Sequence, residues 1–233
     1  MERRELAATL ESGDPAAGLR AVGALYRLAG QIEARSVRLA RERGWSWEQI
    51  GDALGVSRQS IHAKYGKAGA VMPKRLSVDA RKLVLTSATG EARRRGDRRL
   101  GTDHLLLGLL HDEDSAAAQA LGVSLADARA ASDALDLAAL AAAGVQVRTL
   151  GEGPPASFGR RFPPLTSGAR AVFKRAIDEA RPVKSGRIDT TRFLLALLSR
   201  QRPDPGAELL DALGVDPAAV RKRLGGTAGG EAA

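Results

Sequence analysis

The strongest constraint on the fold is a pattern that the chain carries twice. Residues 100–110 (LGTDHLLLGLL) match residues 188–198 (IDTTRFLLALL) at an offset of 88 positions. Upstream, Glu91-Ala92-Arg93 recurs at the same offset as Glu179-Ala180-Arg181, and downstream Leu121-Gly122-Val123 recurs as Leu213-Gly214-Val215 at an offset of 92. Leucine-rich helices like these have no polar face wide enough to meet water. Each copy is therefore expected to cover the apolar face of the other, which gives one pseudo-two-fold helical domain.

Composition predicts an all-α fold for the chain as a whole. Hydrophobic residues make up 44% of it but aromatic residues only 3%, so the core must consist mainly of Ala and Leu packed between helices. Residues typical of strands are sparse. Each copy is predicted to form a helix, a basic loop, an apolar helix capped by its threonine, and a short helix around Leu-Gly-Val.

Several classes of protein are excluded by what the sequence lacks. Without cysteine there are no disulfides or Cys-based metal sites, and this fits the reducing cytoplasm, where we expect the protein. The three histidines are too scattered to suggest a metal site, and neither a cofactor nor a catalytic nucleophile–base pair is expected. No apolar run approaches the ~20 residues of a membrane span, and the N-terminus does not resemble a signal peptide. We therefore expect a protein that is neither an enzyme nor a membrane protein.

Residues 46–65 follow the pattern of a helix-turn-helix, the motif that places its second helix in the DNA major groove. Ser46 and Gln49 have the spacing of a capping box, and Ile50 is the inward residue of the short helix that follows. Gly55 stands where the turn requires a positive φ. A long supporting helix over residues 16–43 is predicted to end at Gly44 and to pack on this motif through Val37 and Leu39.

The outward face of the second helix is rich in donors for phosphate and base edges. Arg58 and Gln59 are the expected base readers, since Arg pairs with guanine and Gln with adenine. The full predicted DNA-binding set is Ser57, Arg58, Gln59, Ser60, His62, Lys64 and Lys67. Residues 1–75 carry 13 Lys and Arg against eight Asp and Glu, which agrees with a nucleic-acid footprint. The alternative is a plain helical hairpin used only for packing.

The duplicated part resembles the Clp N-terminal (Clp R) domain, the double four-helix repeat at the front of ClpA- and ClpC-type unfoldases. The family's mark is a Gly-Thr-Glu-His-Leu-Leu-Leu-Gly-Leu run, and Gly101–Leu109 is nearly that run. Each half of the family domain opens with a Thr-Pro-Glu-Ala-Arg-like segment, whose places are taken by residues 77–81 (SVDAR) and 166–170 (TSGAR). By this alignment the first copy carries one extra residue in its opening helix.

The resemblance divides the chain into modules. A DNA-binding segment is expected at 1–65, a linker at 66–75, the double repeat at 76–224 with halves at about 76–150 and 165–224, and a disordered tail at 225–233. The sequence contains no Gly-x-x-x-x-Gly-Lys-Ser/Thr P-loop, so it has no sign of the family's ATPase module. The chain resembles small ClpC-related proteins that join a helix-turn-helix to a stand-alone Clp N domain.

The resemblance also implies ligands, namely arginine-phosphorylated proteins, adaptors and cyclic peptides. The family's phosphoarginine pockets use the acidic residue of the run, which pairs with the guanidinium, and a nearby Thr at the start of the domain half. Amides at a helix N-terminus suit the phosphate. In the first half Asp103 and Ser77 would take these roles. In the second half Thr166 remains but Thr191 replaces the acid, so that pocket is expected to be weakened. The alternative for Asp103 is a carboxylate that stabilises the dipole of its helix.

Two functions follow from these modules. The first is a DNA-binding regulator, dimeric on DNA, whose peptide or protein ligand changes DNA affinity through the linker at 66–75. The second is an adaptor or decoy that never binds DNA and sequesters unfoldase substrates or toxic peptides. A partner that docks on Clp protease components is a third reading.

Overall fold

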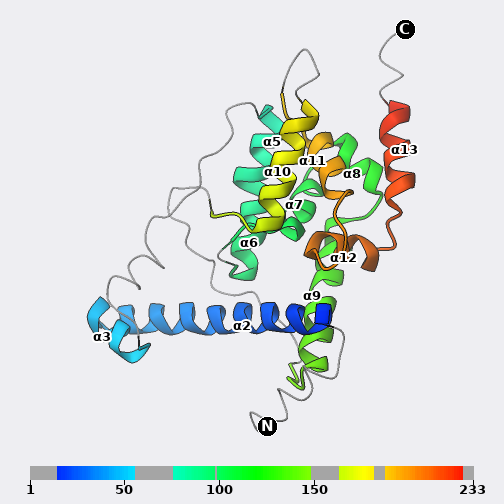
Figure 1. Ribbon diagram of the computed structural model, residues 1–233. Helices are drawn as coiled ribbons and strands as arrows, with labels where there is room; N and C mark the ends of the chain where they lie inside the picture. The colour runs from blue at the N-terminus through cyan, green and yellow to red at the C-terminus, as the bar shows by residue number, and fades with distance from the viewer. Residues whose placement is uncertain (1–14, 56–75, 98, 148–162, 181–186, 228–233) are drawn as a thin grey trace.

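The computed structural model describes residues 15–55, 76–97, 99–147, 163–180 and 187–227, and every regular element within them is helical. The front segment holds α2 (Pro15–Glu42) and α3 (Trp47–Ala53). The first half of the duplicated part comprises α5 (Val78–Lys82), the π-helix η1 (Leu83–Ala88), α6 (Thr89–Arg95), α7 (Thr102–Leu109), α8 (Ala116–Leu121) and α9 (Leu125–Ala142). The second half comprises α10 (Ser167–Ala180), α11 (Thr190–Leu197), α12 (Pro205–Ala212) and α13 (Pro217–Thr227). The predicted all-α fold is confirmed (Figure 1).

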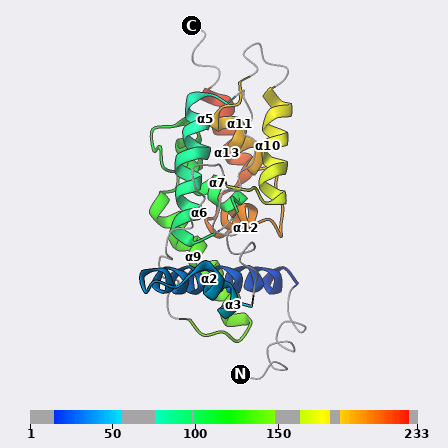
Figure 2. The same cartoon turned by 90° about the vertical axis from the view of Figure 1, so that its left-hand side faces the viewer.

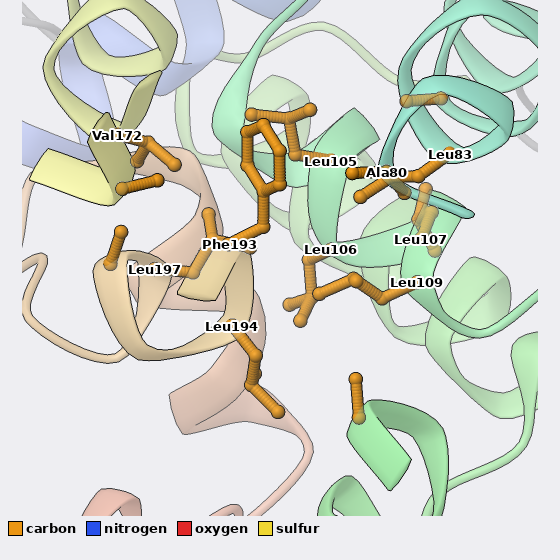
Figure 3. Close-up of a cluster of buried hydrophobic side chains, with 14 of the residues drawn as sticks. Ala80, Leu83, Leu105, Leu106, Leu107, Leu109, Val172, Phe193, Leu194 and Leu197 are labelled. Atoms are coloured by element: carbon orange, nitrogen blue, oxygen red, sulfur yellow. The ribbon is translucent and has the colours of Figure 1, made fainter. Parts of the chain in front are cut away.

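The two leucine-rich runs form the centre of the bundle as α7 and α11. Every residue of α7 is buried, and α7 contacts η1 and α6 of its own half as well as α10, α11 and α12 of the other. Phe193 of α11 is fully buried and meets Phe173 of α10 edge-on, with 4.9 Å between ring centroids. Leu105 and Leu106 point towards it from α7 (Figure 3). The halves therefore share one core, as their apolar helices required.

The halves also exchange backbone contacts where their segments meet. Leu76, just before the opening helix of the first half, forms an isolated bridge with Ile188, just before α11. Leu165, just before the opening helix of the second half, forms the equivalent bridge with Leu100, just before α7. Each opening segment is thus placed beside the apolar run of the opposite half.

The extra residue predicted in the first opening helix takes the form of a π-helix. The segment 78–95 runs without a break through α5, η1 and α6, whereas α10 is a regular α-helix. A π-turn is the usual way in which an α-helix accommodates one inserted residue. At the junction of η1 with α6, the Thr89 hydroxyl donates to the Val84 carbonyl at 2.7 Å, five residues back.

Two local predictions in the duplicated part are wrong. Leu121-Gly122-Val123 is not the middle of a short helix but the turn that ends α8, with Gly122 at φ +68°, and the long helix α9 follows it. Nor do threonines cap the apolar helices. Gly101 and Asp189 occupy the N-cap positions, because each helix begins one residue later, at Thr102 and at Thr190. The Thr102 hydroxyl instead donates to Asp204 of the other half.

The front segment begins as predicted. Ser46 and Gln49 form both hydrogen bonds of the capping box, at 3.1 and 2.8 Å, and Gly55 has φ +66°. Val37 of α2 and Ile50 of α3 are buried against each other, with Trp47 partly buried beside them. Leu39, predicted to join this contact, is instead 44% exposed.

The long helix α2 lies across one end of the helical bundle, as both views show (Figures 1 and 2), and α3 lies at its far end (Figure 1). It packs on α9, where Ala21 is buried against Ala139 and Ala143. The front segment is thus attached directly to the duplicated domain, independently of residues 66–75. Residues 66–75, the predicted linker, lie outside the described residues. The disordered tail predicted at 225–233 was placed too early, because α13 continues to Thr227, and residues 228–233 lie outside the described residues.

Candidate functional site

The first candidate site is a cavity of about 1110 Å³ between α2 and the end of the bundle where Leu100 meets Leu165. Asp103 and Thr166 both line it. Asp103 comes from the first turn of α7 and Thr166 from the residue before α10, so the site combines the acid of the first half with the opening segment of the second.

This arrangement corrects the predicted pairing of Ser77 with Asp103. The Ser77 amide donates to the Ile188 carbonyl at 2.9 Å, which places Ser77 at the opposite meeting point, beside the start of α11. The repeat implied that each half had its own acid and hydroxyl. The hydroxyl of each half instead lies beside the leucine-rich run of the other half, because the two backbone bridges join each opening segment to the opposite run.

Asp103 is buried and held in its ionised form. Its residue is 8% exposed. Burial by itself would raise the pKa of this carboxyl, but the positive charges of Arg95 and Arg27 and a hydrogen bond from the His104 backbone outweigh it and hold the pKa below its usual value. Asp103 therefore presents a permanent negative charge at the edge of the cavity.

His104 is a capping side chain in the first turn of α7. Its Nδ1 accepts from the Gly101 amide at 2.9 Å, and its Nε2 lies 3.0 Å from an Asp97 carboxylate oxygen. Since Nδ1 accepts, this arrangement places the ring proton on Nε2. The ring is 3% exposed, so it fixes the start of α7 rather than facing a ligand.

The floor of the cavity is a hydrogen-bonded junction between the halves. The Thr102 hydroxyl donates to Asp204 at 2.7 Å and accepts from the Gly206 amide at 3.0 Å. Arg200 donates to the same carboxylate at 3.0 Å. Thr166 caps α10 by accepting from the Ala169 amide at 3.1 Å. Arg99 and Arg202 also line the cavity, which therefore presents charges of both signs.

The second meeting point holds a threonine at the position of the expected acid. Ser77 caps α5 through the Ala80 amide at 3.1 Å. Thr191 stands where the acid was expected, while Asp189, two positions earlier, caps α11 and pairs with Arg192. These bonds already satisfy the only carboxylate near this point in the described run 187–198.

Sequence reasoning missed the charges that hold α2 on the domain. Arg27 pairs with Asp136 of α9, and Arg20 pairs with Glu208 of α12. Arg95 pairs with the same Asp136, and Gln31 donates to the Arg95 carbonyl at 2.8 Å. The only signal in the sequence is spacing, since positions 20, 27 and 31 lie on one face of a helix.

The predicted DNA-binding residues Ser57, Arg58, Gln59, Ser60, His62, Lys64 and Lys67 all lie outside the described residues. What is described is the first helix of the motif and its support. No helix in the described ranges is long and apolar enough to span a membrane.

Comparison with known proteins places this site within a family. The model of the Clp repeat (R) N-terminal domain matches residues 76–210. The chain is 30% identical over 213 residues to the chloroplastic chaperone protein ClpC1 of Arabidopsis thaliana, covering 84% of this chain and 21% of that protein. It is 32% identical over 189 residues to the chloroplastic ClpA homologue, an ATP-binding subunit of the ATP-dependent Clp protease, of Brassica napus, covering 74% and 20%. The chain spans about a fifth of the length of these relatives. On these matches and on its doubled helical bundle, the chain belongs to the Clp repeat (R) N-terminal domain family.

Proposed function

We propose that the chain is a DNA-binding transcriptional regulator whose Clp N domain binds a peptide or protein ligand linked to Clp proteolysis. The proposed ligand binding rests on the cavity that brings Asp103, Thr166 and several arginines together. A fixed carboxylate suits a guanidinium, while arginine side chains and the start of α10 suit a phosphate. An arginine-phosphorylated peptide offers both groups, and a cyclic peptide is the second ligand class we propose for the same cavity.

The DNA half of the proposal is supported by the first helix of the motif. The capping box at Ser46, the positive φ of Gly55 and the buried pair Val37–Ile50 are what a helix-turn-helix requires up to its turn. We propose that residues 57–67 continue it as the recognition helix and its flank, and that the module boundaries lie near 65 and 76. The function involves no catalytic step.

A single helix-turn-helix makes few contacts, so we propose a homodimer on a two-fold DNA site. Support comes from large apolar side chains of α2 that face solvent, with Leu19, Tyr26 and Ile32 at 67%, 76% and 60% exposure. Light scattering tests the dimer. Replacing Ile32 with Glu is expected to give a monomer, and an unchanged mass would contradict this use of these side chains.

DNA binding is tested by fluorescence anisotropy with the duplex upstream of the protein's own coding sequence, at low salt, where phosphate contacts are strongest. We expect Arg58→Ala with Gln59→Ala to abolish preference for that duplex, and Lys64→Ala with Lys67→Ala to reduce the salt slope by about one per residue. Arg170→Ala, in α10, is the control. No binding by the unaltered protein at low salt would refute the DNA half.

Ligand binding is tested separately with a labelled peptide that carries one phosphoarginine. Asp103→Asn keeps the shape but removes the charge, so we expect binding to fall by at least tenfold. Asp112→Asn, in an exposed loop, serves as the control. Equal binding by both variants would contradict the assignment of Asp103, whatever the DNA result.

The adaptor or decoy is the second candidate, favoured by the family relationship to ClpC and ClpA chaperones. In that case the chain captures peptides or docks on Clp components, and α2 and α3 serve only for packing. Peptide binding that depends on Asp103, together with no DNA binding at low salt, would select this candidate.

A further inference from the structure

The contact between α2 and the Clp N domain is held mainly by charges. Its apolar part is small, since Ala21, Ala139 and Ala143 are the buried cluster between α2 and α9. The arginine pairs of α2 with Asp136 and Glu208 supply the rest. Polar interfaces within one chain are typically separable, in contrast to large apolar ones.

The same arginines reach the proposed ligand acid. Arg27 lines the 1110 Å³ cavity together with Asp103, and its charge is one of those that lower the pKa of Asp103. Arg20, Arg27, Asp103 and Asp136 line a smaller adjoining hollow of about 150 Å³. Part of the positive charge that a ligand guanidinium would bring to Asp103 is therefore already supplied by Arg27 of α2, beside that of Arg95 of the bundle.

We propose that α2 is a built-in competitor for the ligand site, so that a guanidinium-bearing peptide displaces α2 from the Clp N domain. The proposal rests on the proposed ligand site at Asp103. A ligand guanidinium beside Asp103 stands close to Arg27, and the two like charges repel each other. Arg27 leaves more readily than Arg95, since Arg95 belongs to the bundle itself and is 6% exposed.

Displacement of α2 carries the first helix of the motif with it. Val37, near the end of α2, is buried against Ile50 of α3, and Arg41 lies over the Trp47 ring at 4.8 Å. A helix that leaves the bundle therefore changes where the DNA-binding segment stands. This gives a route from ligand to DNA through α2 in place of the expected route through residues 66–75.

Linkage supplies the test, because two groups that exclude each other weaken each other's binding by the same factor. Anisotropy of the labelled phosphoarginine peptide is measured with the full chain. Arg20→Ala with Arg27→Ala loosens α2, and we expect the peptide to bind at least fivefold more tightly. The matched control is Arg35→Ala with Arg38→Ala, two exposed arginines further along the same helix, which should bind like the unaltered protein.

A second variant guards against misfolding from the unpaired carboxylates. Gln31→Ala removes the hydrogen bond to the Arg95 carbonyl without altering any charge, and we expect a smaller gain in peptide affinity. Hydrogen exchange of α2 in the unaltered protein should also become faster when peptide is added. Unchanged or weaker peptide binding by both variants, or slower exchange in α2, would overturn the proposal. If Asp103→Asn still loses peptide binding when these results fail, the ligand site at Asp103 stands and only the displacement of α2 is refuted. The failure of this proposal and the failure of the proposed ligand site are therefore distinguishable.

Discussion

Glu91 shows how one buried carboxylate is stabilised by its neighbours. It is 1% exposed, and it accepts from Arg129 at 2.5 Å and lies 2.7 Å from His111 Nε2. Burial alone would raise the pKa of Glu91, but the hydrogen bonds from Arg129 and His111 lower it to about 2, from a usual 4.5. A group whose pKa is lowered on folding stabilises the fold above its unfolded pKa and loses that effect as the pH falls towards its folded pKa.

We therefore expect Glu91→Gln to reduce the free energy of unfolding by about 3 kcal/mol above pH 4.5. This difference from the unaltered protein should shrink between pH 4.5 and 2. Urea titrations at a series of pH values measure it. Glu113→Gln, in an exposed loop, should change stability by less than about 0.5 kcal/mol. A difference that stays constant down to pH 2 would contradict the assignment.

Gly108 is required by the close approach of α7 to η1. A Cβ at this position would stand 2.8 Å from the Ala88 amide nitrogen and 2.9 Å from Leu83 Cδ1. We expect Gly108→Ala to destabilise the fold by about 1–3 kcal/mol through overpacking. Gly90→Ala, in α6 with open space around it, should instead stabilise by about 0.5–1 kcal/mol. Thermal or urea unfolding of the pair checks this, and equal effects would count against a tight η1–α7 contact.

The π-helix η1 makes a prediction about deletion. Leu85 is 43% exposed within η1, so removing it should convert the segment to regular α-helix and leave both flanks in register. Deleting Lys174 from α10, also an exposed position, should rotate every later residue of that helix by about 100° and bury polar groups. We expect the first deletion to keep a cooperative unfolding transition and the second to lose it, by circular dichroism. The reverse order would exclude η1 as the site of an inserted residue.

Much of this element-level detail was available from the sequence. The repeat located α7 and α11. Comparison of the two opening segments predicted one extra residue in the first of them, and this is the helix that contains η1. Capping residues predicted the start of α3. The turns at Gly122 and Gly214 were missed because similarity between copies shows that two segments share a structure without showing which structure it is.

At the scale of the whole molecule, the sequence left the site incomplete. It provided Asp103 and Thr166 but paired Asp103 with Ser77, because a repeat does not show that its halves exchange opening segments. The contact of α2 with α9 was also out of reach. Arg20 and Arg27 are ordinary surface residues by spacing, and only the position of Asp136 and Glu208 in space gives them partners.

The central claim is that ligand and DNA act on one another through the docked helix α2. The most direct measurement is the affinity of the full chain for its upstream duplex, with and without a saturating concentration of the phosphoarginine peptide. We predict a change of at least fivefold, and the same factor when peptide affinity is measured with and without duplex, since coupling is reciprocal. Unchanged DNA affinity at full peptide occupancy would show that ligand and DNA are not coupled through α2.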